Sequence, residues 1–159
     1  MTSKTKKRYT AQFGSVSTGT MRPEDLIPVF ADALKDLKTS KEDRKLINDA
    51  ESLDFHEDNE DGVLMDTAEY VLSELFDALD AHAPAYGYFG AHPGDGADYG
   101  WWLGEEWERN FEDVDGLKVA DLTEVPKGYT GEVMQVNDHG NMTLYSYLQG
   151  RGREVWSLV

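Results

Sequence analysis

The period of the hydrophobic pattern changes near the middle of the chain, and this change limits the accessible folds more than any other feature of the sequence. Before residue 84, apolar side chains recur at the three- and four-residue spacing of amphipathic helices. After it, short runs rich in valine, tyrosine and tryptophan alternate with turn-forming glycine, proline and asparagine, which is typical of strands. The 159 residues are therefore expected to form an α+β fold.

About three helices are expected in the first half of the chain. Residues 20–38 predict the first, in which Pro28 should kink the helix or delay its start. The second is expected after Ser40, because the spacing from Ser40 to Asp43 resembles a capping box. Residues 63–83 predict the third and carry the clearest amphipathic pattern of the chain.

Roughly five strands are expected in the second half. Residues 85–103 predict two short aromatic strands on either side of the turn-forming residues 92–96. Residues 131–136, 142–148 and 153–159 predict a three-stranded antiparallel meander that closes the same sheet. The pattern thus predicts helices packed on one face of a single antiparallel sheet.

The domain organisation is expected to be simple. Residues 1–20 are polar, and four lysine or arginine residues lie among the first eight. We expect a basic mobile arm there, with one short edge strand near residues 11–16. Residues 21–159 are expected to form a single α+β domain, because their length suits one hydrophobic core.

The charge of the chain is strongly negative and unevenly distributed. The formal net charge is −16 at pH 7. Fourteen acidic and two basic residues lie between Glu42 and Asp80, a local net of −12, whereas Met1–Arg22 holds five basic residues and no acidic one. Because DNA, RNA and anionic membranes would repel most of the molecule, we expect no direct binding to nucleic acid or membrane and favour a basic protein partner.

The residue composition also bears on location. No cysteine occurs, which excludes a disulfide framework, a thiolate metal site and a cysteine nucleophile, and fits a reducing compartment. The longest apolar runs are only a few residues, too short for a membrane span. We therefore expect a cytoplasmic protein.

The segment "DFHEDNEDG", residues 54–62, holds five acidic side chains and one histidine in nine positions. With Gly62 placed at the sixth position of a calcium-binding EF-hand loop, oxygen-bearing residues fall on the first, third and fifth positions. The twelfth position is then Ala68, so the bidentate glutamate that closes such a site is missing. A solvated acidic loop is the favoured interpretation, and no metal site is expected.

The third expected helix carries acidic residues on one face. They are Asp66, Glu69, Asp77 and Asp80. At about 1.5 Å of rise per residue they extend over roughly 21 Å, and no lysine or arginine accompanies them. One interpretation is a solvated face that serves solubility. The other is that carboxylates at phosphate-like spacing imitate DNA and occupy the basic groove of a nucleic-acid-binding protein.

Three tryptophans offer a second type of contact. Adjacent Trp101 and Trp102 must face opposite sides of a strand, so one of them is expected at the surface. Trp107 lies four positions before Phe111 among acidic residues, a mixture on which arginines of a partner can dock. The alternative, that the second indole packs beneath another element, stays equally open.

Catalytic signatures are weak. The sequence contains no H-E-x-x-H, no G-x-S-x-G and no phosphate-binding loop. His92, Asp95 and Asp98 in "HPGDGAD" could meet around a metal, but turn composition explains the same residues. We therefore expect a protein that is not an enzyme and that has no catalytic residues, no metal and no cofactor.

Three stretches of the chain, "FGSVSTGTMRPEDLIPVFADAL", "YFGAHPGDGADYGWW" and "VNDHGNMTLYSY", together resemble a group of small uncharacterised proteins of bacteriophages and other mobile elements. The similarity covers most of the chain. The group supplies no site residues, but it implies the cytoplasm of a host bacterium as the setting. Acidic anti-restriction and anti-CRISPR inhibitors, some of which imitate DNA, act in that setting, and the link to them is one of analogy.

The leading hypothesis is therefore a non-enzymatic inhibitor or modulator that binds a basic, nucleic-acid-handling host protein, such as a nuclease, through a DNA-mimic-like acidic surface. A second hypothesis is a structural or assembly module that uses surface aromatics, and it leaves a homodimer open. A third is a metal-binding protein. The residues expected to contact a partner are Glu57, Asp58, Glu60, Asp61, Asp66, Glu69, Asp77, Asp80, Trp101, Trp102 and Trp107.

Overall fold

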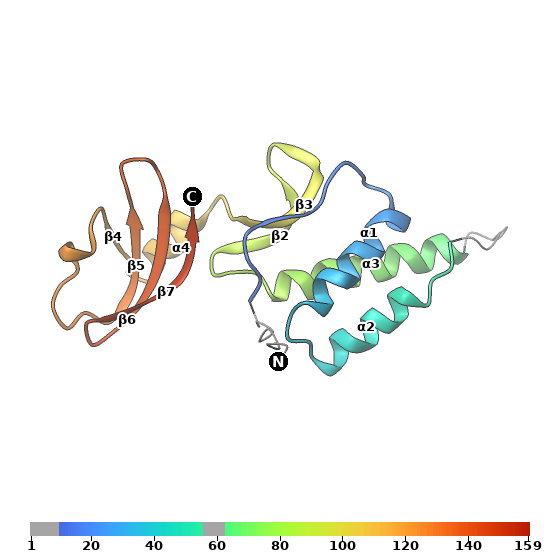
Figure 1. The fold of residues 1–159 in the computed structure, drawn as a ribbon, viewed down its shortest axis with the longest axis horizontal. Helices are drawn as coiled ribbons and strands as arrows, with labels where there is room; N and C mark the ends of the chain where they lie inside the picture. The colour runs from blue at the N-terminus through green and yellow to red at the C-terminus, as the bar shows by residue number, and fades with distance from the viewer. Residues whose placement is uncertain (1–9, 56–62) are drawn as a thin grey trace, which may run out of the picture. The chain divides into compact units, whose positions relative to one another are not determined.

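The structure is a computed structural model that describes residues 10–55 and 63–159. It is an α+β protein, as the sequence predicted, and divides into two compact units, Met1–Trp102 and Leu103–Val159 (Figure 1). The assignment of residues 21–159 to a single domain stays a prediction, as does the mobility of the N-terminal arm.

Three helices form most of the first unit: α1 (Pro23–Lys35), α2 (Lys41–Glu51) and α3 (Val63–Ala81) (Figure 1). They confirm the three helices predicted for this half of the chain. α1 begins at a proline, whose fixed φ suits the first turn, so Pro28 lies inside the helix and does not delay its start. α1 packs against both α2 and α3. The side chains that α1 buries are Leu26, Ile27, Phe30, Ala31 and Leu34.

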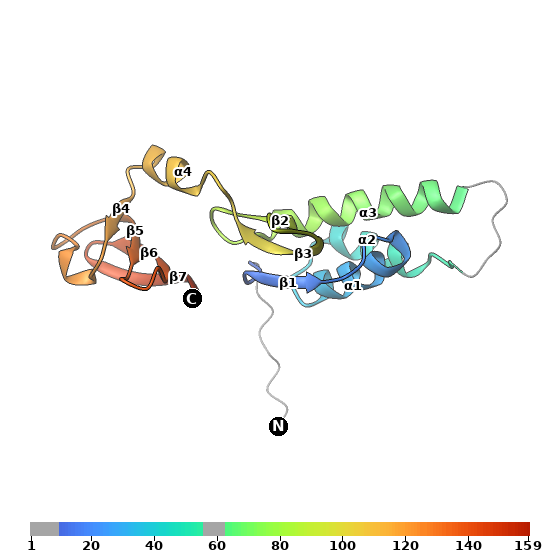
Figure 2. The same cartoon turned by 90° about the horizontal axis from the view of Figure 1, so that it is seen from above.

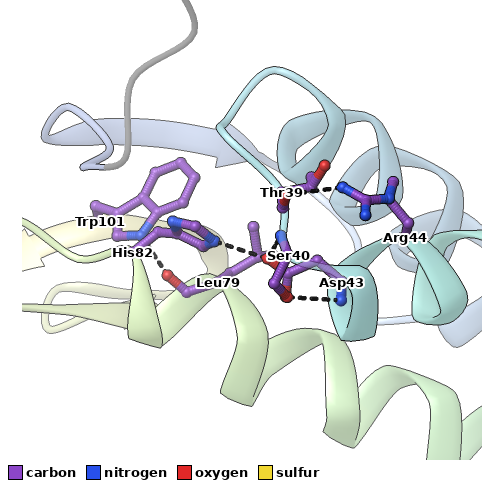
Figure 3. A network of polar contacts seen from close by, with 7 residues as sticks. All are labelled: Thr39, Ser40, Asp43, Arg44, Leu79, His82 and Trp101. Carbon is purple, nitrogen blue, oxygen red and sulfur yellow. Dashed lines mark hydrogen bonds and ion pairs between the residues drawn. The ribbon is translucent and has the colours of Figure 1, made fainter.

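A polar network joins the start of α2 to the end of α3 (Figure 3). The predicted capping box is present: Ser40 Oγ accepts a hydrogen bond from the Asp43 amide at 3.0 Å, and the Ser40 amide donates to Asp43 Oδ2 at 3.1 Å. The same carboxylate oxygen lies 3.1 Å from His82 Nε2. The Asp43 and His82 side chains are only 14% and 13% exposed. One carboxylate therefore caps a helix and connects it to a second helix.

A three-stranded antiparallel sheet completes the first unit. Its strands are β1 (Gly14–Ser17), β2 (Gly87–His92) and β3 (Asp95–Leu103), in the order β1-β3-β2. β1 is the edge strand predicted near residues 11–16, and β2 and β3 are the two predicted aromatic strands. Gly100 of β3 must be a glycine, because a Cβ there would lie 2.0 Å from the carbonyl oxygen of Gly14.

Aromatic rings join this sheet to the helices. Phe30 of α1 makes edge contacts with Phe76 of α3 and with Phe89 of β2, each at 5.1 Å between ring centroids. Trp101 of β3 packs against Phe89 at 5.0 Å, and its Nε1 donates a hydrogen bond to the Leu79 carbonyl at 2.9 Å. Edge-to-face pairs are worth about 0.5–1.5 kcal/mol beyond the area that they bury, so this cluster fixes the helices on the sheet.

The second unit contains one helix, α4 (Trp107–Asp113), and a four-stranded sheet. Its strands are β4 (Leu117–Val119), β5 (Gly131–Val136), β6 (Met142–Leu148) and β7 (Arg151–Leu158), in chain order across the sheet. β5, β6 and β7 pair antiparallel and confirm the predicted meander, whereas β4 pairs parallel to β5. α4 lies over one face of the sheet (Figure 2).

The predicted count of elements and the single sheet are wrong. The described residues form four α-helices and seven strands, and the strands make two sheets of three and four strands. The sequence analysis missed α4 because its seven residues are too short for an amphipathic stripe. It missed β4 because three residues give no alternating pattern. In addition, β4 and β5 are parallel strands joined through a 3-10 turn at Leu122–Glu124, and such a connection has no hairpin signal.

Replacement of Asp43 by alanine should destabilise the first unit. The change removes the capping interaction and leaves the half-buried His82 without this partner, so we expect a loss of about 1–3 kcal/mol in the free energy of unfolding. Urea denaturation followed by far-UV circular dichroism measures the loss. Glu42→Ala is the matched control, because Glu42 is an exposed acid in the same helical turn. An equal loss in both variants would contradict the role given to the Asp43 carboxylate.

Candidate functional site: the acidic face of helix α3

Helix α3 separates apolar and acidic side chains onto opposite sides. Ala68, Val71, Leu75 and Leu79 are buried at helical spacing, which places the residues between them on the solvent side. The row predicted from the sequence is present there, since all four of its carboxylates are exposed. We use the name acidic face for the exposed residues of this side, which are Asp66, Glu69, Tyr70, Ser73, Glu74, Asp77 and Asp80.

The carboxylates of the acidic face are almost free of partners within the described part of the chain. The ion pairs of the described residues involve acids outside this face, such as Glu51, which pairs with Lys35. Asp80 is the exception, because its Oδ1 accepts a hydrogen bond from the Phe89 amide at 2.9 Å and so supports the start of β2. Asp66, Glu69, Glu74 and Asp77 make no ion pair or hydrogen bond with residues 10–55 or 63–159.

This arrangement opposes helix stability. Asp77 lies three residues from both Glu74 and Asp80, and like charges at that spacing cost about 0.2–0.5 kcal/mol per pair. The negative end of the helix dipole lies nearby, since α3 ends at Ala81 with no basic residue in its last turn. The acids of this face are therefore not explained by the stability of the helix that carries them.

The sequence analysis missed Tyr70 and Glu74 of the acidic face. Tyr70 is 67% exposed and lies one turn after Asp66 and one turn before Glu74. The signal was available, because residues four positions apart share a helix face. Tyr70 adds to the face an aromatic ring, on which an arginine side chain can stack.

The structure does not describe four of the predicted contact residues. Glu57, Asp58, Glu60 and Asp61 fall outside the described residues, as does the comparison with a calcium-binding loop.

The tryptophans have structural partners. Trp101 is only 6% exposed, so little of its side chain is open to a partner. Trp102, on the opposite side of β3, is half-buried; its Nε1 donates to the Gly90 carbonyl at 2.9 Å, and its ring contacts His92 at 4.7 Å. In the second unit, the Lys118 ammonium lies 5.4 Å from the ring centroid of Trp107. A role of Trp102 and Trp107 in partner binding stays a prediction.

The turn residues considered as metal ligands are engaged locally. His92 Nδ1 accepts from the Gly94 amide at 2.9 Å, and Asp95 Oδ1 accepts from the Ala97 amide at 3.0 Å. Asp98 Oδ1 is buried without a hydrogen-bond partner among the described residues. No group of three histidine or acidic side chains in the described ranges lies close enough to hold a metal ion.

Comparison with known proteins adds no relative. No protein-family model, no curated protein and no solved structure matches the chain. The resemblance to proteins of mobile elements therefore stays a prediction from the sequence. None of the helices in the described residues is both long enough and apolar enough to cross a membrane.

Replacement of Asp77 by asparagine should stabilise the protein. The change relieves two like-charge pairs and removes a negative charge near the C-terminal end of α3, so we expect a gain of about 0.3–1 kcal/mol at low ionic strength. The gain should shrink in high salt, because salt screens these exposed charges.

Thermal unfolding at low and high salt measures this gain. Asp49→Asn is the matched control, because exposed Asp49 of α2 has Lys45 four residues before it and should gain nothing. If the melting temperature of Asp77→Asn were equal to or below that of the unchanged protein, charge repulsion on the acidic face would not destabilise α3.

Proposed function

We propose that this protein is a non-enzymatic inhibitor or modulator that binds a basic, nucleic-acid-handling protein through the acidic face of α3. The observation that carries the proposal is a row of exposed carboxylates on one rigid helix, of which only Asp80 has a hydrogen-bond partner among the described residues. A surface that costs stability, and of which only Asp80 has a side-chain partner within the described chain, is suited to binding something outside it.

The charge density of the acidic face supports the comparison with DNA. Five carboxylates lie from Asp66 to Asp80, over a rise of roughly 21 Å, which is a mean spacing of about 5 Å. One strand of duplex DNA carries about one phosphate per 3.4 Å. A groove whose lysines and arginines match a nucleic-acid strand would therefore meet on α3 a row of negative charge that is comparable but sparser.

The composition of the acidic face also indicates the side chains that it would bind. Exposed carboxylates accept hydrogen bonds from guanidinium groups, and the Tyr70 ring offers a π face to the same groups. Because arginine stacks and hydrogen-bonds at once, an arginine-rich groove suits this face better than a lysine-rich one. In this proposal the protein acts in the cytoplasm of a bacterium that hosts a mobile element, as the sequence resemblance implies.

Charge reversal tests the proposal directly. In the variant Asp66→Lys/Glu69→Lys/Asp77→Lys, Asp80 is kept because it supports β2. Affinity capture of host proteins by the unchanged chain at low salt should retain a DNA-binding protein that duplex DNA displaces. The triple variant should lose at least about tenfold in affinity for that protein, because three exposed charge pairs of up to about 1 kcal/mol each are lost.

A matched control separates local geometry from overall charge. Glu105→Lys/Glu112→Lys/Asp113→Lys makes the same change in net charge on exposed positions of the second unit, and should keep most of the affinity. If both triple variants lost the same affinity, net charge alone would explain the effect. Full retention of the captured protein by the α3 variant would reject the acidic face as the binding surface.

The alternative assembly module makes a different prediction. If half-buried Trp102 or Trp107 joined copies of the chain, light scattering would show an oligomer that Trp102→Ala or Trp107→Ala dissociates, whereas reversal of the α3 charges would leave it intact.

A further inference from the structure

Three tyrosines form a cluster on one face of the second unit's sheet. Tyr147 of β6 lies 6.3 Å from Tyr145 and 6.3 Å from Tyr129, between ring centroids, and its ring is inclined by 64° and 68° to theirs. Tyr145 and Tyr147 are two residues apart on one strand, so both project from the same face. We call Tyr129, Tyr145 and Tyr147 the tyrosine cluster.

The tyrosine cluster lies on the face opposite α4. Lys118 of β4, Met134 of β5 and Leu144 of β6 are cross-strand neighbours and share one face. The Lys118 ammonium lies over the Trp107 ring, which assigns that face to α4. Because Tyr145 follows Leu144 directly along the strand, the tyrosines project from the other face.

Glycines on the neighbouring strands let the rings lie close to the sheet. Tyr147 pairs with Gly131 of β5 and with Gly152 of β7. A Cβ at Gly152 would lie 2.6 Å from Tyr147 Cζ, and one at Gly131 would lie 2.9 Å from the Tyr129 hydroxyl. The rings are half-buried as a result, and their remaining surface is open to solvent.

A fixed carboxylate borders the tyrosine cluster. Glu154 of β7 is the cross-strand partner of Tyr145, and its Oε1 accepts a hydrogen bond from Ser157 Oγ at 2.9 Å. The Ser157 hydroxyl is held in turn by Thr143 Oγ1 at 2.9 Å. Within the described chain Glu154 forms no ion pair and Oε2 accepts no hydrogen bond. Burial, together with the nearby Glu154 charge, raises the pKa of Tyr145, which keeps this hydroxyl protonated and the ring neutral at pH 7.

These groups suit a cation. Neutral tyrosine rings attract positive charge to their faces, and the free oxygen of Glu154 offers a hydrogen-bond acceptor beside them. The second unit strengthens the attraction, since residues 103–159 hold eleven acidic and five basic residues, a net of −6. The same charge disfavours the stacking of a nucleotide, whose phosphate would be repelled.

We propose that the tyrosine cluster and Glu154 form a binding site for an arginine side chain of a basic protein partner. Arginine is preferred to lysine because its planar guanidinium is weakly hydrated, stacks on aromatic rings and can donate a hydrogen bond to a carboxylate from its edge. The site belongs to the second unit and does not depend on the acidic face of α3, so either surface can fail its test without the other.

The experiment uses the full chain labelled with ¹⁵N and a capped tripeptide, acetyl-Gly-Arg-Gly-amide. The same tripeptide with lysine and with citrulline, which keeps the shape of arginine without its charge, serves as the comparison. We expect the arginine peptide to shift the amide resonances of β6 and β7 and to bind roughly two- to thirtyfold more tightly than the citrulline peptide, the range of a cation on an aromatic surface. The lysine peptide should bind more weakly than the arginine peptide.

Variants identify the groups responsible. Tyr147→Leu should abolish the shifts, and Glu154→Gln, which can keep the hydrogen bond from Ser157, should weaken binding several-fold. Asp138→Asn removes one charge from an exposed turn of the same unit and should bind as the unchanged chain does. If Tyr147→Leu fails to fold, Glu154→Gln compared with Asp138→Asn decides the question.

Three results would overturn the proposal. They are the absence of shifts in β6 and β7 with the arginine peptide, equal binding of the citrulline peptide, which would indicate neutral stacking, and equal losses in Glu154→Gln and Asp138→Asn, which would indicate attraction by net charge alone.

Discussion

Helix α3 can be buried along only one stripe, and the first unit depends on this constraint. Its apolar residues pack against α1, α2 and β2, and they supply Leu75 and Leu79 to a core in which both are fully buried. Everything on the opposite side of the helix must then face solvent. Because five of the seven residues of the acidic face are acidic, folding of the core places a row of negative charge on a helix. The stability of the buried stripe offsets the repulsion within the exposed one.

The second unit obtains its exposed surface differently. Its sheet has two faces, and α4 covers only one of them (Figure 2). On the other face, glycines opposite Tyr147 leave space for aromatic rings to lie against the backbone, so large side chains are half-buried rather than fully exposed. A carboxylate fixed by a hydroxyl pair borders them. The first unit therefore displays its acidic groups on a helix, and the second displays Glu154 on a sheet beside aromatic rings.

The sequence predicted the elements whose signals are local and strong. The capping box at Ser40, the amphipathic stripe of α3 and the three-stranded meander were all expected and are all present. The short α4 and the parallel β4 were missed, because seven and three residues carry too little periodicity. The number of sheets was also wrong. Which strands share a sheet depends on pairings distant in the sequence, as between β1 and β3, and no local pattern encodes them.

In the candidate sites too, features with a local sequence signal were predictable and features that depend on strand pairing were not. Exposure of the acidic residues on α3 followed from helical periodicity, and Tyr70 would have been found by continuing the same four-residue step. The burial of Trp101 could not be predicted, because adjacent tryptophans only determine that they face opposite sides. The tyrosine cluster required the strand register, since Tyr129 and Glu154 come from segments on either side of β6. A binding surface assembled across strands becomes visible only after the pairing is known.

The two surfaces would respond differently to salt. The acidic face of α3 relies on exposed charges, whose attraction to a partner falls within a Debye length of about 8 Å at physiological ionic strength. The tyrosine cluster combines one carboxylate with half-buried rings, and stacking on a ring is screened much less than a pair of exposed charges. In these two proposals, the first unit thus provides long-range attraction and the second provides short-range selection of arginine. A basic partner could meet the first by its net charge, but it would have to present a guanidinium to engage the second.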